Sequence, residues 1–152
     1  MQGHLRPAQP KFSRPPRSGP VRAFRRGMRV LVVDCDDDRR DLICVAVSVL
    51  GHKAEEAWDT RQALVALAAD AFDVVIVDDQ TPGFDLLEVT ELLVAATRRA
   101  RRRPAVVVVS GDLDIGGRTA LFRAGVVEVL SRPLSLAPLH GLLTRIGRTV
   151  PG

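Results

Sequence analysis

The sequence of 152 residues is poor in aromatic residues and in cysteines. Aromatic side chains make up 4% of it and tyrosine is absent, so a surface that stacks the bases of single-stranded nucleic acid is poorly supplied. The two cysteines, Cys35 and Cys44, are too few for the disulfide framework of a small secreted domain or for a zinc site of four cysteines.

Long hydrophobic runs are also lacking. No apolar stretch approaches the roughly 20 residues that a membrane span requires, and the N-terminus has no apolar block of the kind found in secretory signals. We therefore expect a cytoplasmic protein without membrane insertion. Hydrophobic residues make up 46% and charged residues 26% of the chain, as in ordinary globular proteins. The length predicts one domain, which we place at residues 28–148, with a short tail at 149–152.

Acidic residues are absent from the first 27 positions, which carry seven Lys or Arg and five of the ten prolines. Subtracting these seven from the 22 basic residues leaves 15 against 18 acidic residues, a net charge of −3 for the remainder. A segment of this composition buries too little apolar surface to fold alone, so we predict that residues 1–27 are disordered. Three interpretations stay open: an arm for nucleic acid or anionic lipid, an inert extension, or a translational start at Met28.

From Met28 onward, short apolar runs alternate with helical segments. Asp37 or Asp38 is expected to cap the first helix, Asp59 with Gln62 forms a capping box for the second, and Ser135 caps the last. The predicted strands are 29–33, 53–57, 73–77, 105–109 and 126–130, and the predicted helices are 38–50, 60–69, 86–99, 115–124 and 136–146.

Five β-α units of this spacing predict an α/β fold with a parallel sheet and helices on both faces. Right-handed crossovers favour a doubly wound, five-stranded sheet in the order 2-1-3-4-5. The carboxyl ends of its strands then bring Asp34, Asp78, Ser110 and Arg132 to one edge, where such sheets bind ligands. Carboxylates that lie close together repel one another, and a hard divalent cation such as Mg²⁺ supplies a physical reason for the cluster.

These residues resemble the receiver domain of two-component response regulators. The resemblance runs from about Arg29 to Ile146 and rests on an ordered set of motifs. The set comprises a valine-rich strand ending at Asp34, with further acids and Arg40; a second such strand ending at Asp78, with Pro82-Gly83; four valines before Ser110; Ala124-Gly125; and Arg132-Pro133.

The resemblance implies a signalling domain with a flavodoxin-like fold rather than an enzyme. Asp78 would accept a phosphoryl group from a histidine kinase or phosphotransfer protein, and Asp34 and Asp78 would hold Mg²⁺. Ser110 and Arg132 would contact the phosphoryl oxygens. A downstream protein would bind the face formed by the helix at 115–124, the strand at 126–130 and the last helix.

Three of the departures from the family pattern bear on phosphorylation or on its relay. Cys35 stands where a second acid is usual, and a thiol is a poor ligand for Mg²⁺, so metal affinity should fall unless Asp36 turns inward. Arg132 replaces the usual lysine with a planar and longer cation. Val129 stands where an aromatic switch residue is frequent. The alternative is therefore a pseudo-receiver, which has the same fold and binds a partner without phosphorylation.

Two other functions receive less support. Asp34-Cys35-Asp36 resembles the nucleophile pair of haloacid dehalogenase phosphatases, but the lysine of that family has no candidate, because Lys11 lies in the tail and Lys53 beside the second strand. The arginines between Arg98 and Arg103 suit a solvated helix end or a patch for nucleic acid or an acidic partner.

Overall fold

The computed structural model describes residues 27–81, 90, 91, 93, 94 and 103–149. These residues form a sheet of five strands, with β1 at Arg29–Val33, β2 at Lys53–Ala57, β3 at Val74–Asp78, β4 at Ala105–Ser110 and β5 at Glu128–Ser131. Four helices accompany the strands: α1 at Asp37–Val49, α2 at Thr60–Ala69, α4 at Ile115–Ala124 and α5 at Leu136–Thr149. Residues 90, 91, 93 and 94 are helical, and the rest of the helix predicted at 86–99 lies outside the described residues.

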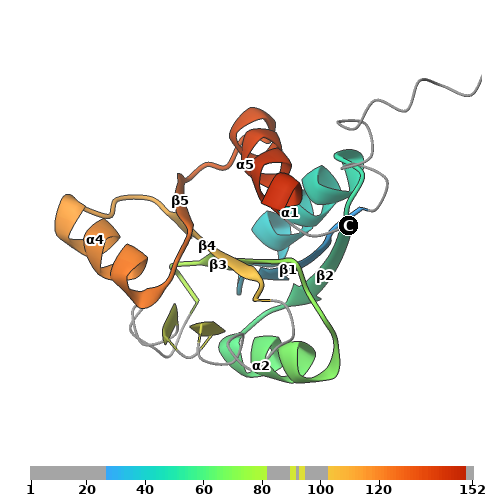
Figure 1. The fold of residues 1–152 in the computed structure, drawn as a ribbon, viewed down its shortest axis with the longest axis horizontal. Coiled ribbons are helices and arrows are strands. Elements are labelled where there is room, and N and C mark those ends of the chain that lie inside the picture. The colour runs from blue at the N-terminus through green and yellow to red at the C-terminus, as the bar shows by residue number, and fades with distance from the viewer. Residues whose placement is uncertain (1–26, 82–89, 92, 95–102, 150–152) are drawn as a thin grey trace, which may run out of the picture.

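The strands are parallel and lie in the order β2-β1-β3-β4-β5, which confirms the predicted α/β fold. Figure 1 shows α1 and α5 on one side of the sheet and α2 on the other. The register places Val33 opposite Val77 and Asp78 opposite Val109. The carboxyl ends of β1, β3 and β4 therefore meet at one edge of the sheet.

Valine-rich strands fill the interior because both faces of the sheet are covered. Side chains alternate between the two faces along each strand, so neighbouring residues such as Val32 and Val33 enter different hydrophobic clusters. One cluster packs under α1 and α5 through Ile43, Val47 and Leu143. The other packs under α2 and α4. No helix within the described ranges is long and apolar enough to cross a membrane.

The start of α1 corrects one prediction. Asp36 caps this helix, with its Oδ1 accepting a hydrogen bond from the backbone N–H of Arg39 at 2.9 Å; Asp37 and Asp38 lie in the first turn. Three consecutive aspartates can each serve as a cap, so sequence alone does not choose among them. At α2 the Asp59 side chain caps the helix as predicted, accepting from the N–H of Gln62, but the Gln62 side chain accepts in return from the N–H of Trp58 and not from that of Asp59, so the box is only half formed.

The other boundaries differ little from the predicted ones. β3 begins and ends one residue later than predicted, and β5 begins at Glu128 instead of Val126. α5 continues to Thr149, three residues past its predicted end and one past the predicted end of the domain. The tail predicted at 1–27 lies outside the described residues apart from Gly27, so its disorder stays a prediction.

The cap assignment has a direct test. Asp36→Ala should lower the midpoint of urea unfolding, because an N–H at the start of α1 loses its partner. Asp36→Asn keeps a capping oxygen and should lower this midpoint much less. Asp38→Ala should also lose less than Asp36→Ala, and the opposite order would assign the cap to Asp38.

Candidate functional site

Two buried carboxylates lie side by side at the carboxyl edge of the sheet. Asp34 directly follows β1 and Asp78 ends β3, and these strands are hydrogen-bonded neighbours. The side chains of Asp34 and Asp78 are 0% and 2% exposed. Both carboxylates approach the same atom, Nη2 of Arg39, at 2.9 Å and 3.7 Å. The structure therefore brings together the two acids that the sequence placed at one edge.

Arg39 is the partner of this pair. It lies in the first turn of α1, and its side chain reaches back to the sheet edge. Nε donates to Oδ2 of Asp34 at 3.1 Å and Nη2 donates to Oδ1 at 2.9 Å, which is the two-pronged geometry that makes guanidinium–carboxylate pairs strong. Neighbouring Arg40 has a different role, since it donates to the backbone carbonyl of Asp34 and to the side chain of Asp37.

Ser110 and Arg132 are both bound to Asp79, the residue after Asp78. The hydroxyl of Ser110, at the end of β4, donates to Oδ2 of Asp79 at 2.6 Å. The guanidinium of Arg132, just beyond β5, forms an ion pair with Oδ1 of the same carboxylate. The two side chains that the sequence assigned to phosphoryl oxygens are thus held by a carboxylate of the protein itself.

Cys35 and Asp36 occupy the loop between β1 and α1. The Cys35 thiol donates to the backbone carbonyl of Gln80 at 3.3 Å, linking this loop to the one that follows β3. Asp36 is committed to capping α1, and its carboxylate lies 3.8 Å from Nη1 of Arg39. The sequence expectation that Asp36 turns inward to replace a metal ligand has no contact here to support it.

The two oxygens of Asp78 differ in their surroundings. Oδ1 accepts a hydrogen bond from the backbone N–H of Gln80 at 2.8 Å. Oδ2 is buried without a hydrogen-bond partner, and its nearest cation is Nε of Arg132, at 3.4 Å and itself without a partner. Burial, and to a smaller extent the charge of Asp34, raise the pKa of Asp78 against the lowering effects of the Gln80 N–H, Arg132 and Arg39.

The arrangement does not fit a divalent cation. Mg²⁺ prefers oxygen ligands and uses one or two carboxylates in most proteins, which Asp34 and Asp78 could supply. However, the guanidinium of Arg39 lies within 3.7 Å of both carboxylates, and the adjacent residue is a thiol, Cys35. Within the described part of the chain, no group of three His, Cys, Asp or Glu side chains is arranged to hold a metal.

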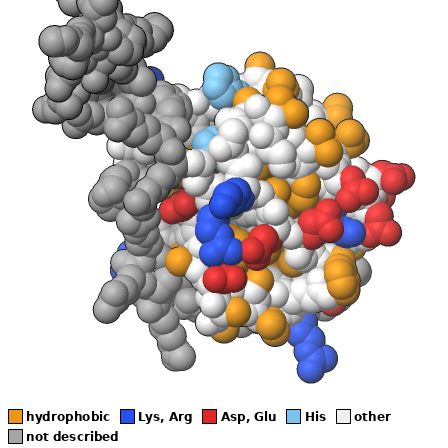
Figure 2. Space-filling model, turned by 90° about the vertical axis from the view of Figure 1, so that its right-hand side faces the viewer, with side chains coloured by type: hydrophobic (Ala, Val, Ile, Leu, Met, Phe, Trp, Pro, Cys, Tyr) orange, Lys and Arg blue, Asp and Glu red, His pale blue; other side chains and the backbone are white. Residues whose placement is uncertain are grey.

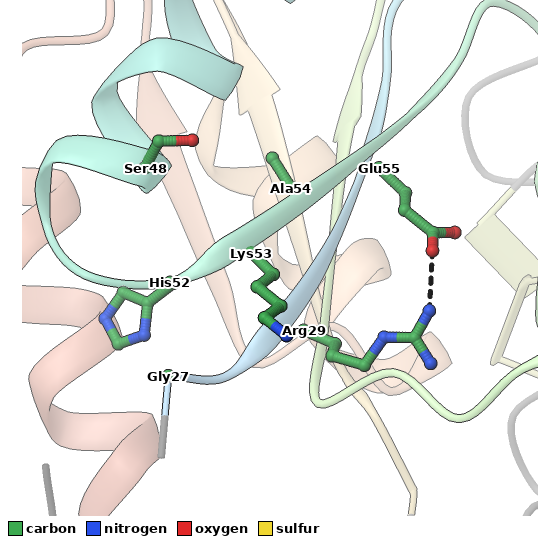
Figure 3. A pocket seen from close by; sticks show the side chains of 7 residues that line it. All are labelled: Gly27, Arg29, Ser48, His52, Lys53, Ala54 and Glu55. Atoms are coloured by element: carbon green, nitrogen blue, oxygen red, sulfur yellow. Dashed lines mark hydrogen bonds and ion pairs between the residues drawn. The ribbon is translucent and has the colours of Figure 1, made fainter. Parts of the chain in front are cut away.

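The opposite edge of the sheet carries a shallow hollow that plays no part in this cluster. Figure 3 shows its lining residues, which come from the starts of β1 and β2 and from the end of α1. Arg29 is paired there with Glu55 at 2.5 Å and with Asp70 at 3.2 Å, and His52 accepts a hydrogen bond from the N–H of Met28. Arg29, Glu55 and His52 of this hollow therefore already have partners within the protein.

The charges on the described surface are mixed. Figure 2 shows acidic and basic side chains next to one another on the face that it draws. Of the arginines between Arg98 and Arg103, only Arg103 is described, and it is exposed. These arginines, whether a solvated helix end or a patch for an acidic partner, therefore lie almost entirely outside the described residues.

The comparisons with known proteins agree with this fold. A family model described as the response regulator receiver domain matches residues 30–144. The chain belongs to this family. Receiver domains are signalling domains in two-component systems, which confirms the resemblance stated from the sequence.

Individual relatives give the same result. The transcriptional regulatory protein TcrA of Mycobacterium tuberculosis is 30% identical over 135 residues, which are 88% of this chain. The chain spans about half, 52%, of that relative. Among solved structures, NtrX from Brucella abortus has a TM-score of 0.71 and 26% identity over 81% of this chain and 27% of its own.

Structural neighbours with a bound metal include a response regulator protein from Burkholderia pseudomallei, with calcium, and a receiver domain with magnesium. The receiver domain of the sensor histidine kinase PA1611 from Pseudomonas aeruginosa carries a magnesium ion in its active-site cleft. It has a TM-score of 0.68 and 21% identity, and the match covers 81% of this chain and 99% of that one. The likeness shows the common fold.

Sequence reasoning missed two residues of the site. Arg39 follows three aspartates at a helix start, where a cation is unfavourable, and this position could have signalled a special role. Asp79, the acid directly after Asp78, received no function from the sequence. The side chain of Asp79 is 15% exposed, and its contacts with β4 and β5 appear only in three dimensions.

The raised pKa of Asp78 predicts how stability depends on pH. The folded protein binds this proton more tightly than the unfolded chain, so the ionised carboxylate costs stability above its folded pKa, and the cost vanishes below the ordinary value of 3.8. Asp78→Asn should therefore raise the free energy of unfolding at pH 7, and the gain should shrink toward pH 4. Urea denaturation at several pH values measures it. A variant less stable than wild type at pH 7 would show that ionised Asp78 stabilises the fold.

Proposed function

We propose that the protein is a receiver that accepts a phosphoryl group on Asp78 from a histidine kinase or phosphotransfer protein. The observation that carries this proposal is the state of Asp78 Oδ2. It is a carboxylate oxygen at the ligand-binding edge of the sheet, without a hydrogen bond, flanked by the guanidinium of Arg132 at 3.4 Å. Carboxylates of this kind serve as nucleophiles toward phosphorus.

The transfer requires little from the protein beyond positioning and charge. Oδ2 of Asp78 forms a bond to phosphorus, the bond from phosphorus to the donor nitrogen breaks, and its electron pair stays on that nitrogen. Arg132 stands close enough to neutralise negative charge on the phosphoryl oxygens. Because Oδ2 is buried, the side chains that cover it must move before a donor can reach it, and Arg132 lies against it at 3.4 Å. No step in this proposal depends on Mg²⁺, which the present arrangement does not fit.

The contacts of Asp79 determine which side chains would move on phosphorylation. Ser110 has a single hydroxyl proton and can donate it to a phosphoryl group only by leaving Asp79, whereas Arg132 would have to divide its guanidinium between Asp79 and the new group. The arriving group and Asp79 are both anions with oxygen acceptors, so phosphorylation would exchange one set of contacts for another. This exchange would move the ends of β4 and β5 together.

The signal would leave through the face formed by α4, β5 and α5. Arg118 of α4 donates to the backbone carbonyl of Val129 in β5 at 3.2 Å, which couples the helix to the strand. Position 129 is a valine, buried at 5% exposure, so this position has no aromatic side chain that could change orientation on phosphorylation. A downstream protein could bury four exposed apolar side chains of this region: Ile115, Phe122, Val127 and Leu136. The cytoplasmic location expected from the sequence is part of this proposal.

A second candidate, the pseudo-receiver, also has an observation in its favour. Three carboxylates at this edge, those of Asp34, Asp78 and Asp79, already have a cation of the protein near them, since Arg39 contacts Asp34 and Arg132 contacts Asp79 and Asp78. A site with this internal compensation can hold one conformation and bind a partner without phosphorylation.

Labelling with a small phosphodonor separates the two functions. Incubation with acetyl phosphate should add about 80 Da to the wild-type protein, as measured by intact mass, and base should remove the adduct. Asp78→Asn should abolish labelling. Asp79→Asn is the matched control at the adjacent acid: it keeps Asp78 and should still be labelled, which excludes Asp79 as the acceptor.

Absence of the adduct in wild type, with a donor that labels a control receiver, would favour the pseudo-receiver. Cys35→Asp combined with Arg132→Lys restores the usual residues at two departures. If these departures block the reaction, the double variant should be labelled. A double variant that stays unlabelled would show that the block lies elsewhere in the site.

A further inference from the structure

Arg39 lies where electrostatics alone would not place a cation. It occupies the third position of α1, and the N-terminus of a helix carries partial positive charge that favours acids. Its side chain nevertheless turns back toward the sheet, in the direction that helical side chains prefer, and is 28% exposed. The attraction must therefore come from the carboxylates around it.

Three carboxylates surround its guanidinium. Asp34 receives two hydrogen bonds, at 2.9 and 3.1 Å. Asp78 lies 3.7 Å and Asp36 3.8 Å from its nitrogens. Hydrogen bonding to Asp34 is the main reason that the pKa of Arg39 is raised. The guanidinium thus bridges the loop after β1, the start of α1 and the end of β3.

Asp34 needs this cation more than the other acids do. Its side chain is fully buried, and an unpaired buried carboxylate is strongly unfavourable. The other nearby arginines do not replace Arg39. Arg40 donates to the backbone carbonyl of Asp34 and not to its carboxylate, and the ion pairs of Arg132 are with Asp78 and Asp79.

We propose that Arg39 is the resident counter-cation of the Asp34–Asp78 pair and excludes divalent cations from it. The guanidinium takes the position between the two carboxylates that a metal ion would need. Its loss should convert a site that rejects Mg²⁺ into one that binds it. The role of Arg39 as a counter-cation is argued from the contacts alone. Its consequence, that phosphoryl transfer proceeds without added Mg²⁺, rests on the proposed function.

The test is rescue of stability by a cation. Arg39→Met keeps the length of the side chain and removes its charge, and without divalent ions it should lower Tm by about 5 °C or more, as loss of a buried partner does. Millimolar Mg²⁺ should raise the Tm of this variant, because an ion that binds only the folded state stabilises it. The wild-type Tm should stay unchanged. Water-proton relaxation with Mn²⁺ should show at least tenfold tighter binding by Arg39→Met than by wild type.

Two controls separate this role from a general loss of structure. Arg40→Met removes the adjacent arginine, whose side chain contacts neither site carboxylate, and its loss of stability should not be rescued by Mg²⁺. Adding Asp34→Asn to Arg39→Met should abolish the rescue. If Arg39→Met does not fold, Arg39→Lys, which keeps the charge but loses the fork, should bind Mn²⁺ more tightly than wild type.

Wild-type protein that binds Mn²⁺ as tightly as the Arg39 variants would overturn the inference, as would variants that gain no binding. These outcomes are independent of acetyl phosphate labelling. Wild type that is unlabelled beside an Arg39→Met variant that gains metal binding would defeat the proposed function and leave the role of Arg39 standing. If wild type is labelled and the Arg39 variants bind metal no more tightly than wild type, the proposed function stands and the role of Arg39 is wrong.

Discussion

Two carboxylates buried next to each other at the ends of parallel strands are the constraint on which this site depends. Asp34 and Asp78 are brought together by the pairing of β1 with β3, and neither side chain has solvent to screen it. Buried like charges must find a cation, a proton or strong hydrogen-bond donors. Several of the other polar contacts described at this edge supply cations and hydrogen-bond donors to these two carboxylates.

These cations and donors come from different parts of the chain. Arg39 comes from α1, the N–H of Gln80 from the loop after β3, and Arg132 from the end of β5. The site therefore joins elements that are far apart in the sequence but adjacent at one sheet edge. A change at any of these positions alters the charge that the others face, so substitutions here should not be additive.

Much of the fold could be predicted because it follows from local pattern. Continuous valine runs indicate strands covered on both faces, and the right-handed crossover rule leaves few strand orders. The convergence of Asp34 and Asp78 followed from that topology. The functional roles of these residues came from the family resemblance and are not settled by the fold.

The contacts within the site could not be predicted in the same way. Arg39 meets Asp34 because a helical side chain bends back over the preceding loop, and the choice between Arg39 and Arg40 depends on the cap at Asp36. Asp79 reaches Ser110 and Arg132 across two strands. Such distances depend on side-chain rotamers, which a residue pattern does not specify.

The hold of Asp79 on Ser110 and Arg132 limits how strongly any ligand could drive a conformational change here. A ligand shifts an equilibrium only by the difference between its interactions in the two states. An incoming anion would replace contacts that a resident anion already makes, so the net driving energy would be a small difference between similar terms. Such a domain would respond to its input with a graded change in populations rather than with an all-or-none transition.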